Sequence, residues 1–217
     1  MAVYEMQSPF DLDEIKTLCV GDIVYVSGRA FTCRSRLHRW VFDEGHPSPR
    51  AAMERDLLIH VGPIVLENKD RFELVSFMPT SSIRFEKWGA RAVEEWGLHM
   101  IIGKTTMGPE TMKAMQRNAC VHVSPQSVSP NLWSSSIRIT DVELFNELGT
   151  IEATWHMELD QLGPFVVDID TQGNNLFEKM DDVVAENQRK AYRTLGIPED
   201  FQYTKLYLTA RTSKSNE

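Results

Sequence analysis

Two short segments combine hydroxyl groups with cationic side chains where strand-like runs give way to helical patterns. The first reads Met-Pro-Thr-Ser-Ser-Ile-Arg and supplies Thr80, Ser81 and Arg84. The second reads Gly-Lys-Thr-Thr, begins at Gly103 and supplies Lys104. Helix N-termini stabilise anions because their first N–H groups are unpaired and the helix dipole is positive there. The two segments therefore predict a site for a small, multiply charged anion.

A cluster of arginines adds a further candidate to this site. Four lie close together in an otherwise acidic chain: Arg29, Arg34, Arg36 and Arg39. We interpret Arg36 and Arg39 as surface residues paired with Asp43 or Glu44. Arg34 differs because it follows an extended segment at its exit, where side chains can point into a site.

The chemistry of these groups together suits a dicarboxylate. Arginine holds a carboxylate through two parallel hydrogen bonds, and lysine acts as a point charge. We therefore expect Arg34, Arg84 and Lys104 to bind the ligand, with Thr80 and Ser81 beside them; a hydroxyl can take part in proton transfer. Positive charge favours loss of a proton next to a carboxylate because it stabilises the developing dianion. Loss of a neighbouring hydroxyl then gives an alkene, and expelling hydroxide needs a Lewis acid.

A phosphate-loop interpretation of Gly103-Lys104-Thr105 fails on one position. That motif needs a further glycine five residues before Gly103, and position 98 is Leu in an apolar run. The loop that cradles a phosphate is therefore missing, and a nucleotide site is not expected.

The cysteines and histidines do not have the spacing of metal ligands. Cys19, Cys33 and Cys120 are isolated from one another, and the six histidines include no i, i+4 pair. We expect Cys19 and Cys120 in the core, while Cys33, next to an arginine, is open. The sequence predicts no metal site in this chain, so the isolated chain should fold without iron and have no activity.

Composition limits the possible partners. The chain has 217 residues, 42% of them hydrophobic and 25% charged, with a net charge of −8, which is typical of one globular domain and not of a nucleic-acid-binding protein. No apolar run approaches the ~20 residues that span a bilayer. Residues 1–14 carry acids but no targeting pattern. We expect a cytoplasmic protein that binds neither nucleic acid nor membrane.

Strand and helix patterns alternate along the chain, with hairpins between them, which favours a mixed, layered α/β domain. Expected strands include residues 22–27, 30–33, 56–61, 98–102, 120–124, 151–159 and 165–169, with a hairpin over 64–75 that turns at 68–70. Expected helices cover 36–42, 80–96, the segment after Pro109 and a final amphipathic stretch ending near Gly196. We divide the chain into an N-terminal extension (1–14), one domain (15–196) and a tail (197–217).

Several runs in this chain, in the right order, resemble a known family. They are residues 21–28, 31–34, 38–39, 60–65, 79–84, 103–104, 107–109, 147–149 and 167–175. The chain resembles, over residues 15–178, the beta subunit of the iron–sulfur hydro-lyases, namely L-tartrate dehydratase and two-subunit class I fumarase, and the tartrate dehydratase branch is the nearer match.

The resemblance implies a fold, a partner and a role for each site residue. The family's beta domain is a swivelling β/β/α fold that closes over an alpha subunit, and that partner holds a four-iron four-sulfur cluster; an alpha2beta2 heterotetramer is expected. Residues matching Arg34, Arg84, Thr80, Ser81 and Lys104 contact the substrate, and the threonine is the candidate base. The implied activity is that of a hydro-lyase on a 2-hydroxy dicarboxylic acid.

The chain departs from the family pattern around the expected pocket. Met78, Ser35 and the pair Thr105-Thr106 replace glycine, aspartate and glycine-rich residues, and residues 124–131 carry two prolines in place of a Gly/Ala-rich stretch. These added side chains predict that fumarate hydration is not the best reaction. A non-catalytic anion-binding or assembly module that keeps the fold is the competing hypothesis.

Overall fold

The computed structural model describes residues 1–68, 71–126, 130–198 and 200–201. The chain divides into two units, Met1–Glu178 and Lys179–Glu217, and the candidate site residues all lie in the first. None of the described helices is long and apolar enough to cross a membrane.

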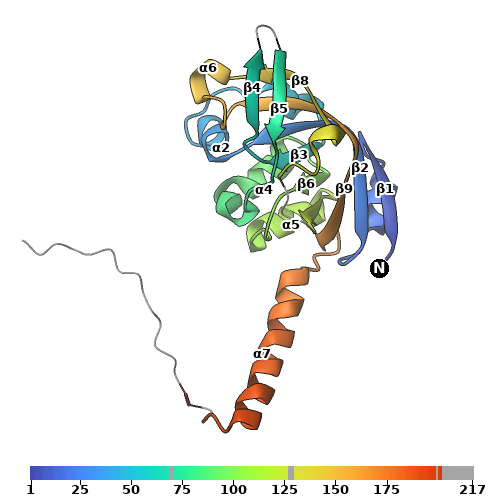
Figure 1. Ribbon diagram of the computed structural model, residues 1–217, viewed down its shortest axis with the longest axis vertical. Coiled ribbons are helices and arrows are strands. Elements are labelled where there is room, and N and C mark those ends of the chain that lie inside the picture. Colours follow the sequence, from blue (N-terminus) through green and yellow to red (C-terminus); the bar gives the residue numbers. More distant parts are fainter. Residues whose placement is uncertain (69–70, 127–129, 199, 202–217) are drawn as a thin grey trace, which may run out of the picture. The chain divides into compact units, whose positions relative to one another are not determined.

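The first unit is built on a mixed sheet (Figure 1). Its strands, in spatial order, are β1 (Val3–Ser8), β2 (Ile23–Cys33), β3 (Leu57–His60), β6 (Met100–Ile102), β7 (Val121–Pro125), β9 (Thr154–Ile169) and β8 (Ile137–Glu143). The pairs from β1 through β7 are parallel, whereas β9 is antiparallel to β7 and β8. Because β9 also pairs with β2, the strands β2, β3, β6, β7 and β9 close into a ring of neighbours. The predicted α/β class with mixed sheets is confirmed.

Both faces of the central strands are buried, and the side chains alternate between two cores. Leu57 and Ile59 of β3 join one core, and Leu58 between them joins the other. The same alternation holds for Met100 and Ile101 of β6. Such near-continuous apolar runs are typical of parallel strands that are covered on both sides.

Helices cover one face of these strands (Figure 1). They are α2 (Ser35–Phe42), α3 (Arg50–Glu54), α4 (Glu86–Glu95) and α5 (Pro109–Arg117). The predicted aromatic stripe is confirmed: Phe85 and Trp96 are buried, and Trp88 packs beside them. That stripe begins in the 3-10 turn η1 (Ser82–Phe85), which leads directly into α4.

The hairpin of β4 (Ile64–Asn68) and β5 (Arg71–Ser76) packs one face against the core that contains Leu57 and Ile59. Phe72 meets the buried Trp155 edge to face, with ring centroids 4.9 Å apart, and Phe145 contacts the same indole. The predicted hairpin is confirmed, although residues 69–70 of its expected turn lie outside the described residues. The remaining short elements are α1 (Leu12–Thr17), α6 (Phe145–Leu148) and the 3-10 turn η2 (Ser134–Ser136).

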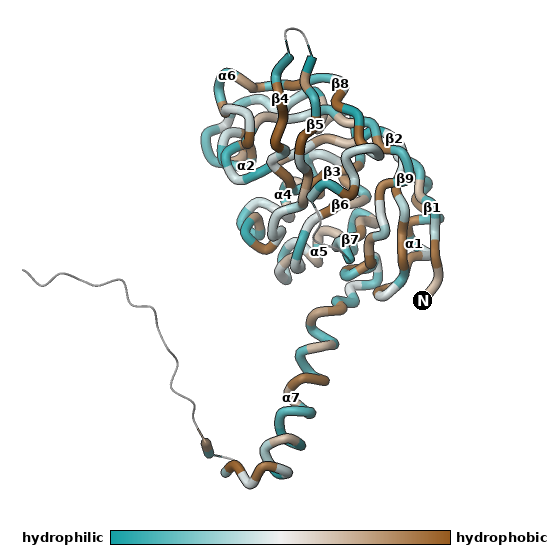
Figure 2. Tube along the Cα trace, in the orientation of Figure 1, coloured by the Kyte–Doolittle hydropathy of each residue, from teal (hydrophilic) through white to brown (hydrophobic). Residues whose placement is uncertain are grey.

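The final helix, α7 (Leu176–Leu195), matches the predicted C-terminal helix in type and extent. Hydrophobic and hydrophilic stretches alternate along it, as an amphipathic pattern requires (Figure 2).

Two boundary predictions were wrong. Residues 151–159 and 165–169 were predicted as separate strands, but the single strand β9 (Thr154–Ile169) covers most of both. Residues 22–27 and 30–33 were predicted as separate strands, but they form the single strand β2, which passes through Gly28. Gly28 has φ +103°, and a Cβ added to it would lie 2.3 Å from the carbonyl oxygen of Ser8. The glycine therefore allows β2 to continue past a close backbone contact instead of ending there.

We predict that Gly28→Ala lowers the free energy of unfolding by about 3 kcal/mol, because it adds overpacking to the cost of a positive φ. Gly21→Ala is the matched control: Gly21 has φ +93° but no atom within 4 Å of an added Cβ, so it should lose only about 1–2 kcal/mol. Urea unfolding of both variants measures the difference, and equal losses would show that the contact with Ser8 is unimportant.

Candidate functional site

Four parallel strands, β2, β3, β6 and β7, end at the same edge of the sheet. Arg34 directly follows β2, and Gly103-Lys104 directly follows β6. In open α/β sheets ligands bind outside the carboxyl ends of the strands. The sheet therefore brings the two cationic segments, distant in sequence, to one edge.

The segment from Thr80 to Ser82 joins this edge through backbone hydrogen bonds. The Thr80 N–H donates to the His60 carbonyl (2.7 Å), and the Lys104 N–H donates to the Thr80 carbonyl (2.9 Å). The Ser82 N–H donates in turn to the Lys104 carbonyl (2.8 Å), and Ser81 pairs with Lys104 as a parallel bridge. Thr80, Ser81 and Lys104, predicted as a group, are thus neighbours in the structure.

Arg34 is held at the same edge by an acidic partner. Its Nε lies 3.7 Å from a carboxylate oxygen of Glu152, whose other oxygen accepts a hydrogen bond from the Arg36 N–H (2.8 Å). A Cβ added to Gly62, two residues beyond the end of β3, would lie 2.7 Å from Nη1 of Arg34. The guanidinium therefore lies against the end of β3, to which the Thr80 N–H also donates its hydrogen bond.

Arg84 is exposed on η1, and Lys104 is half-buried. Neither forms an ion pair with a carboxylate in the described part of the chain. Two cations that remain unpaired in an acidic chain can bind an external anion.

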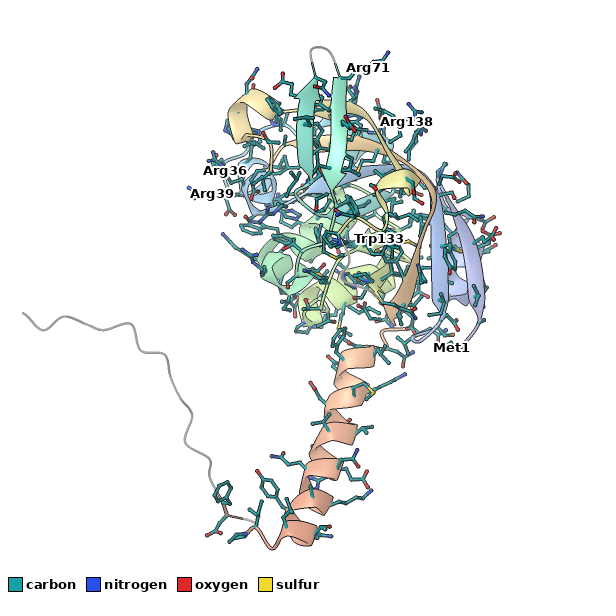
Figure 3. All side chains as sticks on the ribbon, viewed as in Figure 1. Met1, Arg36, Arg39, Arg71, Trp133 and Arg138 are labelled. Atoms are coloured by element: carbon teal, nitrogen blue, oxygen red, sulfur yellow. The ribbon has the colours of Figure 1, made fainter. Side chains whose placement is uncertain are left out.

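The interpretation of Arg39 as a surface residue is confirmed by its ion pair with Glu44 (2.9 Å). Figure 3 shows Arg36 beside it on α2, and both side chains are exposed. Asp43, the other expected partner, instead binds the ammonium of Lys87 and the indole N–H of Trp88. These bonds lower the pKa of the Asp43 carboxyl.

Beneath the edge lies a buried polar cluster that sequence reasoning missed. The Ser82 hydroxyl is 2.8 Å from Nδ1 of His60 and 2.8 Å from Nε2 of His122. Nδ1 of His122 is 2.5 Å from a carboxylate oxygen of Asp168. All four side chains are at most 1% exposed.

Sequence comparisons relate the chain to known proteins. Residues 3–180 match the family model described as "Fumarase C-terminus". The chain belongs to this family. It is 31% identical over 183 residues to the L(+)-tartrate dehydratase subunit beta of Escherichia coli K12. The matched region covers 84% of this chain and 90% of that subunit. The predicted resemblance is confirmed.

Two more distant members of the fumarase C-terminus family cover nearly as much of the chain. A candidate L(+)-tartrate dehydratase subunit beta of Methanocaldococcus jannaschii is 28% identical over 80% of this chain and 90% of its own length. A candidate class I fumarate hydratase of Geobacillus stearothermophilus is 27% identical over 82% of this chain, but this match covers only 34% of that protein.

The expectation that free N–H groups at the helix N-termini would bind the anion was wrong for α5. The first N–H groups of α5, which follow the Gly103 segment, already donate to the carboxylate of Glu86 from the Gly108, Glu110 and Thr111 backbone. The dipole of α5 is therefore neutralised from within the chain. The N-cap of η1 is Ser81, which makes no side-chain capping bond.

The cysteines do not fit a metal or cluster site in the described part of the chain, which also contains no group of three or more possible metal-binding side chains. Cys33 and Cys120 are buried, and burial raises the pKa of both thiols, with Glu152 and Asp56 adding to the effect. Thiolates, the form that binds metal, are therefore disfavoured. Cys120 lies in the core as predicted; the prediction for Cys19 was wrong, because its side chain is exposed.

The signal for the missed cluster was the two-residue period of the strands. Val121 and Val123 point into one core, so His122 must face the opposite side. The period does not hold at Asp168, because its neighbours Val167 and Ile169 join different cores. A polar residue within a strand that is buried on both faces needs a buried partner, but the period cannot say which one.

Burial keeps His38 and His60 neutral. It lowers the pKa of His38 to about 3, and it lowers that of His60 well below the usual value, with smaller effects from His38 and His122. His38 stacks between Trp88 and Trp96. Neither of its ring nitrogens has a hydrogen-bond partner among the described residues.

We predict that His38 weakens the fold in acid. The unfolded chain binds this proton near pH 6.5 and the folded chain only near pH 3, so unfolding takes up a proton in that window. The free energy of unfolding therefore falls as pH falls from 6.5 to 3, by about 1.4 kcal/mol per pH unit from this residue.

His38→Phe should reduce the slope of unfolding free energy against pH by that amount between pH 4 and 6, as measured by urea unfolding. Trp96→Phe alters the same aromatic stack without removing a titrating group, and the indole N–H that it removes donates to the hydroxyl of Ser48, so its slope should match the wild type. An unchanged slope in His38→Phe would mean that His38 binds its proton equally well in the folded chain.

Proposed function

We propose that this chain is the beta subunit of a hydro-lyase that reversibly dehydrates a 2-hydroxy dicarboxylic acid similar to L-tartrate or malate. The observation that carries the proposal is the hydrogen-bonded arrangement of Thr80, Ser81 and Lys104 at the sheet edge, with Arg34 at the same edge. The tartrate dehydratase and fumarate hydratase names of its relatives support the same reaction class.

Each residue has a distinct role in this proposal. Arg34 and Arg84 bind the two carboxylates of the substrate, and the Ser81 hydroxyl donates a hydrogen bond beside them. Thr80 and Lys104 act together in proton transfer, because a threonine hydroxyl is a weak base unless a nearby cation lowers its pKa. The geometry that supports this pairing is the bond from the Lys104 N–H to the Thr80 carbonyl.

The reaction balances without oxidation or reduction. A proton leaves the carbon next to one carboxylate, and its electron pair becomes the second bond to the neighbouring carbon. The hydroxyl on that carbon departs as water, leaving an unsaturated dicarboxylate. Positive charge from Arg34, Arg84 and Lys104 stabilises the developing dianion.

A partner subunit is part of the proposal. The relatives that match nearly end to end are named as beta subunits, and the candidate fumarate hydratase contains much more chain than the matched part. We assign the remaining catalytic part to an alpha subunit that holds a four-iron four-sulfur cluster, in an alpha2beta2 assembly in the cytoplasm. The raised pKa values of the buried thiols here support placing the cluster in the partner.

The deciding experiment is anaerobic reconstitution with the protein encoded next to this one. We expect dehydration of at least one compound in a panel of malate, L- and D-tartrate and substituted malates, with fumarate hydration not the best reaction. If this chain binds anions but no reconstituted complex dehydrates any of these compounds, the competing hypothesis of a non-catalytic anion-binding or assembly module is favoured.

We predict that Arg34→Lys raises the Michaelis constant of the reconstituted enzyme, because lysine keeps the charge but loses the paired hydrogen bonds. The loss in kcat/KM should correspond to about 2–4 kcal/mol. Arg36→Lys is the matched control two residues away, on the exposed surface of α2. Equal kinetics for the two variants would remove Arg34 from the site.

Thr80→Val should reduce kcat more than it raises KM, since it removes a proton-transfer group and leaves the arginines in place. Lys104→Met should give the same defect, and the double variant should be little worse, because the two residues act as a unit. Thr111→Val is a suitable control, because the buried Thr111 hydroxyl has no hydrogen-bond partner among the described residues. Normal turnover in Thr80→Val at saturating substrate would show that Thr80 is not the base.

A further inference from the structure

The buried side chains of Ser82, His60, His122 and Asp168 have no role in the proposed chemistry, yet they lie directly under it. Ser82 is the central residue of this cluster. Its side chain contacts His60 at the end of β3 and His122 within β7, and its backbone N–H donates to the Lys104 carbonyl. One residue thus connects the buried cluster with the segment that carries the proposed proton-transfer lysine.

The hydrogen-bonding capacity of these groups is satisfied by one consistent arrangement. A carboxylate accepts only, so Asp168 accepts from Nδ1–H of His122, and Nε2 of that ring is left as an acceptor. The Ser82 hydroxyl donates to this nitrogen and accepts from Nδ1–H of His60. The burial that keeps His60 neutral is compatible with this arrangement.

Ser124 lies between Asp168, at the other end of the buried cluster, and the segment that carries Lys104. The Ser124 hydroxyl lies within hydrogen-bonding distance of both the second carboxylate oxygen of Asp168 and the carbonyl of Thr105 (3.0 Å). Because the Ser124 hydroxyl can donate only one hydrogen bond, it serves either the carboxylate or the carbonyl, and the bond that holds the Lys104 segment is the one from the Ser82 backbone N–H.

Gly103 shows how closely this segment lies on the cluster. A Cβ added to Gly103 would be 1.7 Å from the Ser82 hydroxyl oxygen and 2.9 Å from Nε2 of His122. Any side chain at position 103 would have to displace the Ser82 hydroxyl, so the glycine allows Lys104 to rest on the buried groups.

The order Asp168, His122, Ser82 resembles the acid, base and nucleophile of a hydrolase, but the burial contradicts that function. The serine is 0% exposed, so an acyl group cannot reach its oxygen. That oxygen is also shared between two imidazoles. A fully satisfied polar network in a buried place rigidifies and specifies its surroundings.

We propose that Ser82, His60, His122 and Asp168 are positioning residues that hold Thr80, Ser81 and Lys104 in their working geometry. This inference rests on the proposed hydro-lyase function. It predicts a defect in turnover that is larger than the defect in substrate binding, because Arg34 is held by Glu152 and not by this network.

The test compares Ser82→Ala with Ser8→Ala. Both serines are buried and both hydroxyls have two hydrogen-bond partners, but Ser8 contacts Arg29 and Asp56, and Asp56 precedes β3, at the opposite end of that strand from the site. In the reconstituted enzyme we expect Ser82→Ala to lower kcat by about 10²-fold with KM within about twofold, the size of effect that a small misplacement produces. Ser8→Ala should leave both constants within about twofold.

A second measurement needs no activity. Hydrogen exchange of the full chain should show faster exchange of the Lys104 amide in Ser82→Ala than in Ser8→Ala when both are compared at equal global stability. If Ser82→Ala fails to fold, Ser124→Ala, at the half-buried rim, should give the same two changes in smaller degree.

Equal protection of the Lys104 amide in the serine variants would overturn the positioning role, whatever the activity. If the wild-type complex shows no dehydration, the proposed function fails, while the exchange comparison still decides whether the buried groups hold Lys104. A change in KM equal to the change in kcat would also contradict the inference.

Discussion

The backbone hydrogen bonds between residues 80–82 and Lys104 are the contacts on which the candidate site depends. They add a short extended segment to the carboxyl edge of the sheet, next to the end of β3. Without them, the hydroxyls and the ammonium would belong to separate loops. Because the bonds are made by the main chain, they do not depend on which side chains these positions carry.

Cationic side chains lie on the outer side of this edge, whereas burial keeps two histidines neutral on the inner side. On the outer side, Arg84 and Lys104 keep their charges without a carboxylate partner among the described residues. On the inner side, burial lowers the pKa of His38 and His60, so these rings add no positive charge of their own. The site can therefore concentrate cations for a dianion without placing further like charges beneath them, where the cost in low dielectric is high.

Sequence patterns predicted correctly those features of the fold and the site that depend on interactions between residues close together in the sequence and on the chemistry of single residues. The α/β class, the aromatic stripe of α4 and the grouping of Thr80 with Lys104 followed from periodicity and from residue chemistry. The contacts that were missed join residues far apart in sequence: His60, His122 and Asp168 are separated from their partners by 22, 40 and 46 positions. The same limit applies to Glu86, which caps α5 from another helix, and to Gly28, where a neighbouring strand allows β2 to continue.

The long strand β9 has a consequence for how the chain is made. It is the last strand among the described residues, yet it pairs with β2, β7 and β8, so the ring of strands stays open until residue 169 has been synthesised. Until then, β2 and β7 present unpaired edges that can bind to other chains. A nascent chain stalled before β9 is therefore a substrate for chaperones, and truncation upstream of residue 154 should yield aggregates instead of a smaller folded domain.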